Sequence, residues 1–551
     1  MKKKILSVIL SILTTISSLF LFTACKDEFE EEINTDQTQL FIGIYDGGFG
    51  HQWLRDLADE FEALYANEPF EEGKMGVQII IDPKKTEYQD TNLKASISTG
   101  INDMYFSTIN VSDFVDSDLL LDITTAVTTP LTEYGETRSI ADKINTNAKN
   151  YQLQSSASGD KYYAIPNYIG FSNIVYDVDL FEEKKFYFAT DGSWTSGRVG
   201  DKQKWVGQDG IEGTLDDGLP VTFDDYKKMI YQMKKLSVTP FIWSGAYSWY
   251  RTDMLTALWA NYEGANDFSL NIHFTGTDST FGPIDKTNGY LLQKQEGKRP
   301  ALIFAEYVMS DVNNYAANSF GSSTHMGVQD EFLYSRKKAA SDSTIKPIAM
   351  LWEGNWWENE AKNTIVNMAT SAEYQNRRFG LMTFPRMDEN ANTNYVMYSV
   401  SPNANVFIRK NAVQPKLAKM FLRYTTTDKA LRYYTKETGA LRDMKYSLEE
   451  SDLENMSYYK RAVWDKFSNA NTTVVYNCDN SAFSKRRPDF LRGAWAFGAE
   501  FANTILIDPL ESFKLYGPTS SYEGTKLTSA EYFRLMAETY DKNYWDKTYK
   551  N

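Results

Sequence analysis

Leu40-Phe41-Ile42-Gly43-Ile44-Tyr45 runs directly into Asp46-Gly47-Gly48-Phe49-Gly50. Its short apolar run predicts a buried strand, and the two adjacent glycines predict the turn that ends the strand. Apolar residues then recur at the spacing of an amphipathic helix: Trp53, Leu54, Leu57, Phe61, Leu64 and Tyr65. The chain therefore opens with a strand, a turn and a helix.

The same order continues along the chain. Residues 77–81 predict a second strand, a helix is expected around residues 92–98, and residues 103–106 predict a third strand. Strands that alternate with helices indicate a parallel sheet joined by right-handed crossovers. The predicted fold class is α/β.

Some later helices are marked by their first residues. Thr222 with Asp225, and Thr528 with Glu531, have the spacing of a capping box, and Pro415 opens a third helix. In contrast, residues 186–220 are rich in Gly and Asp, and residues 264–345 are polar with few periodic signals. Loops this long in a compact domain are usually functional or have local structure that the sequence pattern does not reveal.

Composition excludes several classes of protein. The 551 residues carry a net charge of −15, only two cysteines, and 42% hydrophobic residues. This content supports large cores, and the acidic balance argues against a nucleic-acid partner, which would need clustered Lys and Arg. Two cysteines cannot build a disulfide scaffold. The unusual feature is an aromatic content of 15%, which serves core packing, a ligand, or both.

The N-terminus has the pattern of an export signal. Lys2, Lys3 and Lys4 precede an apolar run that ends in Leu21-Phe22-Thr23-Ala24-Cys25. Small residues before a cysteine resemble a bacterial lipobox, which makes Cys25 the predicted lipidation site. A plain signal peptide and an uncleaved anchor helix are the alternatives. The prediction is a lipoprotein signal peptide over residues 1–24.

An acidic tether follows the predicted leader. Residues 25–39 are polar and acidic, which is typical of a linker between a lipid anchor and a folded body. Removal of residues 1–24 takes away three lysines and no acids, so the remaining chain carries −18. The expected location is the extracellular face of the cell membrane, in a Gram-positive cell. Contact with the membrane is expected through the anchor only.

Four groups of residues, spread over residues 40–445, resemble one family. They are Phe41–Tyr45 with Gly47, Gly48, Gly50 and Trp53; Lys161–Pro166 with Ile174–Asp177, Leu180 and Phe181; Ala349, Met350 and Glu353–Trp356; and Asn405–Ile408 with Lys416, Ala418, Lys419, Phe421, Leu422 and Gly439–Arg442. In this order, after a lipobox, they resemble the sugar-binding lipoproteins of bacterial ABC importers, which are maltose-binding-protein-like members of extracellular solute-binding family 1. Asp160, Asp177 and Leu441 depart from the family pattern.

The resemblance implies a fold, which is the two-lobed type II fold of periplasmic binding proteins with a hinge and an interlobe ligand cleft. Matching the motifs assigns residues 38–167 plus about 400–445 to lobe one. It assigns about 168–399 plus 446–551 to lobe two, with crossovers near Asn167 and Ser399. Ligand binding is then expected to close the lobes by hinge bending.

Two aromatic segments are the main candidates for ligand contact. Aromatic rings stack on the flat C–H faces of sugars, and carboxylates bind the hydroxyl groups. The first segment offers Trp352, Glu353 and Trp356, with Trp356 at the position that stacks on ligand in the family. The second segment, which Gly and Ser place on a loop, offers Trp243, Tyr247 and Trp249. The alternative for both segments is a buried aromatic cluster, and of the neighbouring Trp356 and Trp357 at least one is expected in the core.

Polar residues beside the first strand are further candidates. Tyr45, Asp46, His51 and Gln52 follow the carboxyl end of that strand, where open α/β sheets bind ligands. His51 equally fits a helix-capping role.

One acidic loop is a candidate for structural calcium. Asp209, Glu212, Asp216 and Asp217 lie close together on a Gly-rich segment, although their spacing does not match an EF-hand. A solvated turn is the alternative. No other cofactor is expected.

The sequence therefore predicts a monomeric extracellular binding protein, not an enzyme, that takes an oligosaccharide and delivers it to ABC permease subunits. No metalloprotease, redox, phosphate-loop or nucleophile-elbow motif is present. Two alternatives remain open. One is a surface glycoside hydrolase or lyase with Glu353 and Glu358 as its acids. The other is a binding protein for a non-sugar solute such as a peptide.

Overall fold

The fold is given by a computed structural model, which describes residues 32–88, 90–155, 159–370, 376–388, 394–479, 487, 490–497, 508–517 and 526–549. The predicted leader, Cys25 and the first part of the predicted tether lie outside the described residues. Within these ranges, no helix combines the length and the apolar character needed to cross a membrane.

The first sheet has five strands in the order β2-β1-β3-β16-β6. They are β1 (Thr38–Tyr45), β2 (Val77–Lys84), β3 (Met104–Thr108), β6 (Ala164–Pro166) and β16 (Ala404–Ile408). β1 pairs in parallel with β2 and β3, which confirms the predicted parallel sheet. The crossover helices are α2 (Gln52–Leu64) and α3 (Asp90–Thr99). β16 returns antiparallel between β3 and β6.

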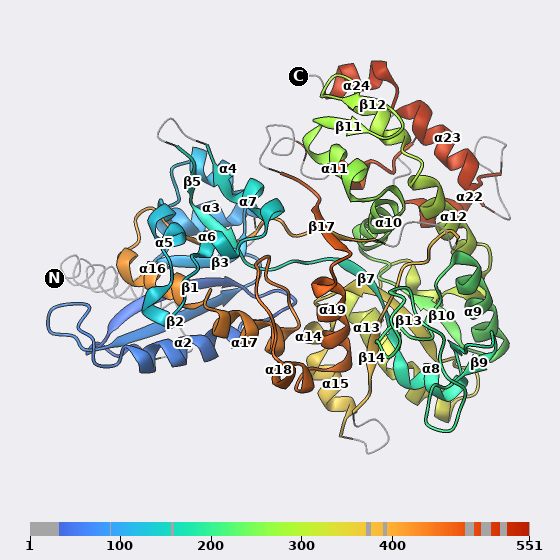
Figure 1. The fold of residues 1–551 in the computed structure, drawn as a ribbon, viewed down its shortest axis with the longest axis horizontal. Helices are drawn as coiled ribbons and strands as arrows, with labels where there is room; N and C mark the ends of the chain where they lie inside the picture. The colour runs from blue at the N-terminus through green and yellow to red at the C-terminus, as the bar shows by residue number, and fades with distance from the viewer. Residues whose placement is uncertain are drawn as a thin grey trace, which may run out of the picture.

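Both faces of this sheet are covered. Alternate residues point to opposite faces of a strand, so Phe106 and Val406 join one core while Tyr105 and Phe407 join the other. The first core also takes residues from α2, from α16 (Pro415–Tyr424) and from α17 (Asp428–Thr438). Figure 1 shows α16 and α17 beside the blue and cyan first half of this lobe, although they come late in the chain.

The second sheet has four strands in the order β10-β13-β7-β14. They are β7 (Ser172–Asp177), β10 (Thr239–Ile242), β13 (Ile348–Gly354) and β14 (Phe379–Met382). β10 and β13 run parallel, and β7 runs antiparallel to β13 and β14. α9 (Phe223–Lys235) begins with the predicted capping box, in which the Thr222 hydroxyl and the Asp225 carboxylate each accept a bond from the other's backbone N–H.

A helical layer extends this second lobe, at the upper right of Figure 1. It contains α10 (Ser248–Glu263), α11 (Ala265–His273), α12 (Lys298–Met309), α22 (Pro509–Tyr516), α23 (Ser529–Thr539) and α24 (Lys542–Thr548). α10 is buried on most sides, as shown by Leu255, Leu258 and Trp259, none of which is exposed. The last part of the chain therefore belongs to the same core as the second sheet.

Three stretches of chain lie side by side between the lobes. The Ile169 N–H donates to the Leu441 carbonyl at 2.8 Å, and the Val400 N–H donates to the Gly170 carbonyl at 2.8 Å. Isolated antiparallel bridges join Ile169 to Leu441 and Phe171 to Ser399. These bonds join the stretches 167–171, 399–403 and 439–442 into a narrow connection between the lobes, which is called the hinge below.

The region at 264–345 has local structure that the sequence pattern did not reveal. It is largely helical, with α11, α12 and α13 (His325–Ser341). The periodic signal is weak because the buried face of α13 includes the polar residues Gln329 and Ser335, and because α12 packs between several neighbours. At the start of α23 the Thr528 hydroxyl accepts from the Glu531 N–H, but the Glu531 carboxylate pairs with Arg534.

Candidate ligand-binding site

Trp356 lies at the meeting point of the two lobes. β13 ends at Gly354, a turn places Trp356, and α14 (Trp357–Glu360) follows. The half-buried indole comes from lobe two but packs against the core of lobe one. A Cβ built on Gly48 would lie 2.6 Å from the Trp356 Cβ, and one built on Gly170 would lie 3.1 Å from its Cζ3. Only glycine therefore permits this approach, which joins the first turn of lobe one, the hinge and lobe two.

Two carboxylates of lobe two, Glu353 and Glu360, lie close to Tyr250, whose ring meets that of Trp356. The Glu360 Oε2 accepts from the Gln329 amide at 3.0 Å, and its Oε1 lies 3.9 Å from His325 Nε2. Glu353 is fully buried; its Oε1 accepts from the Gly354 N–H at 3.1 Å, and its Oε2 has no hydrogen-bonding partner within the described part of the chain. Burial, and then the nearby Glu360 carboxylate, raise the pKa of Glu353 well above its ordinary value.

The second aromatic segment divides between core and cleft. Trp243 is fully buried, packed 4.9 Å from Trp352, so the expectation that it faces a ligand is wrong. Tyr247 is exposed and lies 5.7 Å from His325, between ring centroids. The predicted loop is also shorter than expected, because α10 begins at Ser248 and places Trp249 in its first turn.

Trp249 begins a stack of rings that leads into the cleft. Its ring lies 3.9 Å from that of Tyr250 with an interplanar angle of 24°, and Tyr250 meets Trp356 edge-on at 6.4 Å. Burial, with Glu353 and Glu360 nearby, raises the pKa of the Tyr250 hydroxyl. Tyr250 therefore connects Trp249 to Trp356 and lies beside the two carboxylates.

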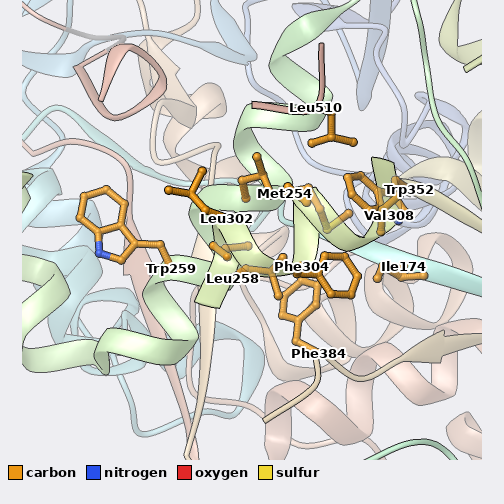
Figure 2. Close-up of a cluster of buried hydrophobic side chains, with 14 of the residues drawn as sticks. Ile174, Met254, Leu258, Trp259, Leu302, Phe304, Val308, Trp352, Phe384 and Leu510 are labelled. Atoms are coloured by element: carbon orange, nitrogen blue, oxygen red, sulfur yellow. The ribbon is translucent and has the colours of Figure 1, made fainter. Parts of the chain in front are cut away.

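Trp352 and Trp357 belong to the cores. Figure 2 shows Trp352 beside Val308, in the cluster that also contains Phe304 and Ile174. The expectation that Trp352 contacts a ligand is therefore wrong: it lies within β13, on the face covered by α12. Trp357 is also fully buried, in the core on the other face of the sheet. Of the neighbouring pair Trp356 and Trp357, one faces the cleft and one the core, as the sequence argument required.

Lobe one contributes the opposite wall of the cleft. Asp46 Oδ1 lies 3.0 Å from His51 Nδ1, so these two predicted residues pair with each other. His51 occupies the N-cap position of α2 without a side-chain capping bond. Burial, then Glu360 of lobe two and Asp46, raise the pKa of Tyr45, which places Tyr45 within electrostatic reach of the opposite wall. Gln52 is exposed and donates to Asp56 on its own helix at 3.0 Å, away from the other candidates.

The cleft is narrow in this structure. A hollow of about 20 Å³ remains on the lobe-one side, lined by Tyr45, Gly48, Asn167, Tyr168 and others. Sites for small ligands have volumes of about 300–1,000 Å³. A larger cavity of about 420 Å³ lies elsewhere in lobe two, by Tyr395 and Lys466, and includes only Asp209 of the predicted residues. We place the candidate site at the cleft because the predicted aromatic and acidic side chains gather there, and a ligand must part the Gly48–Trp356 contact to enter.

The predicted calcium loop does not form a site in this structure. Each of the four side chains accepts a hydrogen bond within the loop or from its neighbours. Asp209 accepts from the Ile211 N–H and Asp217 from the Gly213 N–H. Glu212 accepts from the Gln203 amide, and Asp216 accepts from the Asp209 N–H and the Thr214 hydroxyl. Their carboxylates stabilise the turn instead of converging. The one group of three acids that converges within the described ranges is Glu263, Asp267 and Asp278. These also accept bonds from neighbouring backbone or side chains, and burial raises the pKa of Glu263 to about 7.

Four residues of the cleft escaped the sequence analysis. Glu360 lies one helical turn after Trp356, a spacing that offered a signal. Tyr168 follows Pro166 at the start of the hinge and meets Phe49 edge-on at 5.0 Å. His325 and Gln329 stand one turn apart at the start of α13. No local signal identified these last two, because their helix was not recognised.

Comparison with solved structures identifies the architecture. The chitin oligosaccharide binding protein superposes with a TM-score of 0.53 and 14% identity, over 94% of this chain and all of that one. RafE in complex with raffinose superposes with a TM-score of 0.52 and 12% identity, over 92% of this chain and all of that one. The cyclic α-maltosyl-1,6-maltose binding protein from Arthrobacter globiformis superposes with a TM-score of 0.52 and 12% identity, over 93% of this chain and 100% of that one.

The chain has the fold of a solute-binding protein. This confirms the predicted two-lobed α/β class. No protein-family model matches the chain, and no curated protein matches it. At identities of 12–14% the likeness establishes the fold alone.

Proposed function

We propose that the chain is a solute receptor that binds a carbohydrate, of oligosaccharide length, in the cleft between its lobes. The observation that carries this proposal is the set of aromatic rings and carboxylates around Trp356, contributed by both lobes and the hinge. Stacking rings suit the C–H faces of a sugar, while Glu360, Asp46 and His51 suit its hydroxyl groups. The solved structures of the same fold include proteins named for chitin oligosaccharide and cyclic maltosyl-maltose binding.

Capture then depends on movement of the lobes. The Gly48–Trp356 approach leaves no room for a sugar ring, so the lobes must separate at this contact to admit one. The three hinge stretches permit such a rotation, and the lobes close again over the bound sugar. Part of the binding free energy is spent on the change in lobe position, which lowers the apparent affinity.

The wider setting of the proposal comes from the sequence. Cys25 would carry a lipid on the extracellular face of the membrane, and residues 25–39 would let the acidic body stand away from anionic headgroups. The closed form would be presented to the permease subunits of an ABC importer. The receptor would act as a monomer and would carry out no chemistry on its ligand.

A titration of the purified protein tests the sugar proposal. Calorimetry with raffinose, chitotetraose, maltotriose and a tetrapeptide should detect binding of at least one sugar and no binding of the peptide. Trp356→Ala should lower the affinity for the sugar that binds by at least about tenfold, which corresponds to about 1.4 kcal/mol. Tyr231→Ala is the matched control, because Tyr231 is an aromatic residue of α9 that is 66% exposed. An unchanged affinity in W356A would contradict the site.

The same samples decide between receptor and hydrolase. Glu358 accepts a bond from the Ser457 hydroxyl at 2.7 Å, at the start of α19 (Tyr458–Ser468), so it is engaged in packing within lobe two. Prolonged incubation with each oligosaccharide should therefore return it intact. Turnover that disappears in Glu353→Gln would replace the receptor proposal with an enzyme.

A further inference from the structure

We propose that Arg492, near the end of the chain, positions the aromatic wall of the cleft by holding Trp249. This inference rests on the proposed function for its effect on sugar binding, but its geometry is independent of it. Arg492 lies on α21 (Phe490–Gly493), more than 200 positions after α10. None of the family motifs in the sequence extends to this part of the chain.

Arg492 makes two contacts on one face of α10. Its Nε and Nη2 donate to the two Asp253 oxygens at 2.9 and 2.8 Å, a paired geometry that fixes the plane of the guanidinium. The guanidinium carbon lies 5.4 Å from the Trp249 ring centroid. Residues four apart share a helix face, so one arginine reaches both Trp249 and Asp253.

The carboxylate end of this contact is rigid. Asp253 is only 1% exposed, within the core that α10 forms with the rest of lobe two. The guanidinium is therefore held by a buried partner and presents its face to the indole, where a cation is attracted by the ring. Trp249 stacks on Tyr250, which in turn meets Trp356, so the contact continues into the cleft.

The start of α10 needs such support. Its N-cap residue, Tyr247, makes no side-chain capping bond, and the first turn contains no acid. Helix starts without a cap lose stability and tend to fray. A second arginine acts at the same place: Arg251 pairs with the buried Asp508, and its Nη1 donates to the Ser244 carbonyl at 3.0 Å. The C-terminal segment thus fixes the first turn of α10 at two points.

A double-mutant cycle tests the positioning role. Arg492→Gln removes the cation but keeps a polar side chain that can still meet Asp253, and it should weaken the tightest sugar of the panel about fivefold. In a Trp249→Ala background the same change should lower the sugar affinity by less than about twofold, because the indole through which Arg492 acts is absent. Arg534→Ala is the control: this arginine belongs to the same C-terminal segment but pairs with Glu531 and Glu538 on the solvent-facing side of α23.

A ligand-free measurement separates this inference from the proposed function. The near-ultraviolet circular dichroism of the Trp249–Tyr250 stack should change in R492Q and W249A alike, and remain as in the wild type in R534A. If the wild type binds no sugar, this signal still tests the positioning role. The inference would be overturned if R492Q had the same spectrum and the same sugar affinity as R534A. It would also be overturned if R492Q lowered the affinity as much in the W249A background as in the wild type.

Discussion

β10 and β13 are neighbouring parallel strands, and each is followed by aromatic residues with two different environments. Trp243, one residue after β10, and Trp352, within β13, are fully buried. Tyr247 and Trp356, further beyond the strand ends, lie at the surface of the cleft or on its border. Rings on these strands or directly after them lie in the core, whereas beyond the strand ends the environment changes from one residue to the next, since Trp357 beside Trp356 is fully buried.

The strongest test of this comparison removes a strand-borne ring. Trp352→Ala should lower the free energy of unfolding by about 3–5 kcal/mol, because it leaves a cavity among Phe304, Val308 and Trp243. Urea unfolding followed by circular dichroism measures this loss. Trp352→Phe is the conservative control. A W352A protein with wild-type stability but no sugar binding would place Trp352 in the cleft and break the comparison.

Trp356, which lies in a turn, should matter less for stability and more for sugar affinity than Trp352 does. Trp356→Ala removes a half-buried side chain and should cost about 1 kcal/mol of stability or less, while sugar affinity falls at least about tenfold. Unfolding and calorimetry on the same samples give both numbers. A stability loss as large as that of W352A would mean that Trp356 is a core residue that merely borders the cleft.

A change in lobe one sharpens the same point. Gly48→Ala places a methyl group where the Trp356 Cβ would lie 2.6 Å away, so the lobes must part slightly. We expect a larger radius of gyration by small-angle scattering and a sugar affinity changed by a few fold. The effect should be smaller in a Trp356→Gly background, since the Cβ, Cγ and Cδ1 atoms nearest to the added methyl group are then absent. Equal effects in both backgrounds would show that the Gly48–Trp356 contact does not set the lobe position.

The smallest expected effect concerns the acid at the end of β13. The pKa of Glu353 is raised above its ordinary value of 4.5, so the folded state keeps a proton that the unfolded chain has already lost. Stability must then fall as the pH rises from 4.5 through the folded-state pKa. Thermal unfolding should show that Glu353→Gln loses less stability than the wild type between pH 5 and pH 8.

The difference between the two proteins, and not the wild-type curve, isolates Glu353. Burial also raises the pKa of Asp443 to about 7 and that of Glu263 to about 7, so these groups titrate in the same interval. Parallel curves for the wild type and E353Q would show that the Glu353 carboxyl ionises normally in the folded protein.

The sequence predicted the elements whose signals are local. β1, α2 and β2 form where the apolar periodicity placed them, and the Thr222 capping box forms as expected. Trp356 reaches the cleft through its place in a turn after a strand. His325 could not be found in this way, since it reaches the site only through the packing of α13 beside Glu360.

Burial also separated residues that looked alike in the sequence. Trp243 and Trp249 lie six positions apart in one aromatic segment, but the segment changes from strand end to helix within it. The four acids at 209–217 resembled a cation loop because their spacing is dense. Their oxygens instead satisfy the backbone of a tight turn, and only the three-dimensional path reveals this.

The hinge described above has a mechanical consequence. Three stretches, bonded edge to edge through Ile169, Gly170 and Leu441, form a narrow ribbon between the lobes. Under the proposed function, the lobes would rotate about this ribbon. Trp356, which lies against Gly170 beside the ribbon, would then travel a short arc, whereas groups at the outer rim would travel a long one. The gap at the rim would set the length of sugar chain that still permits closure.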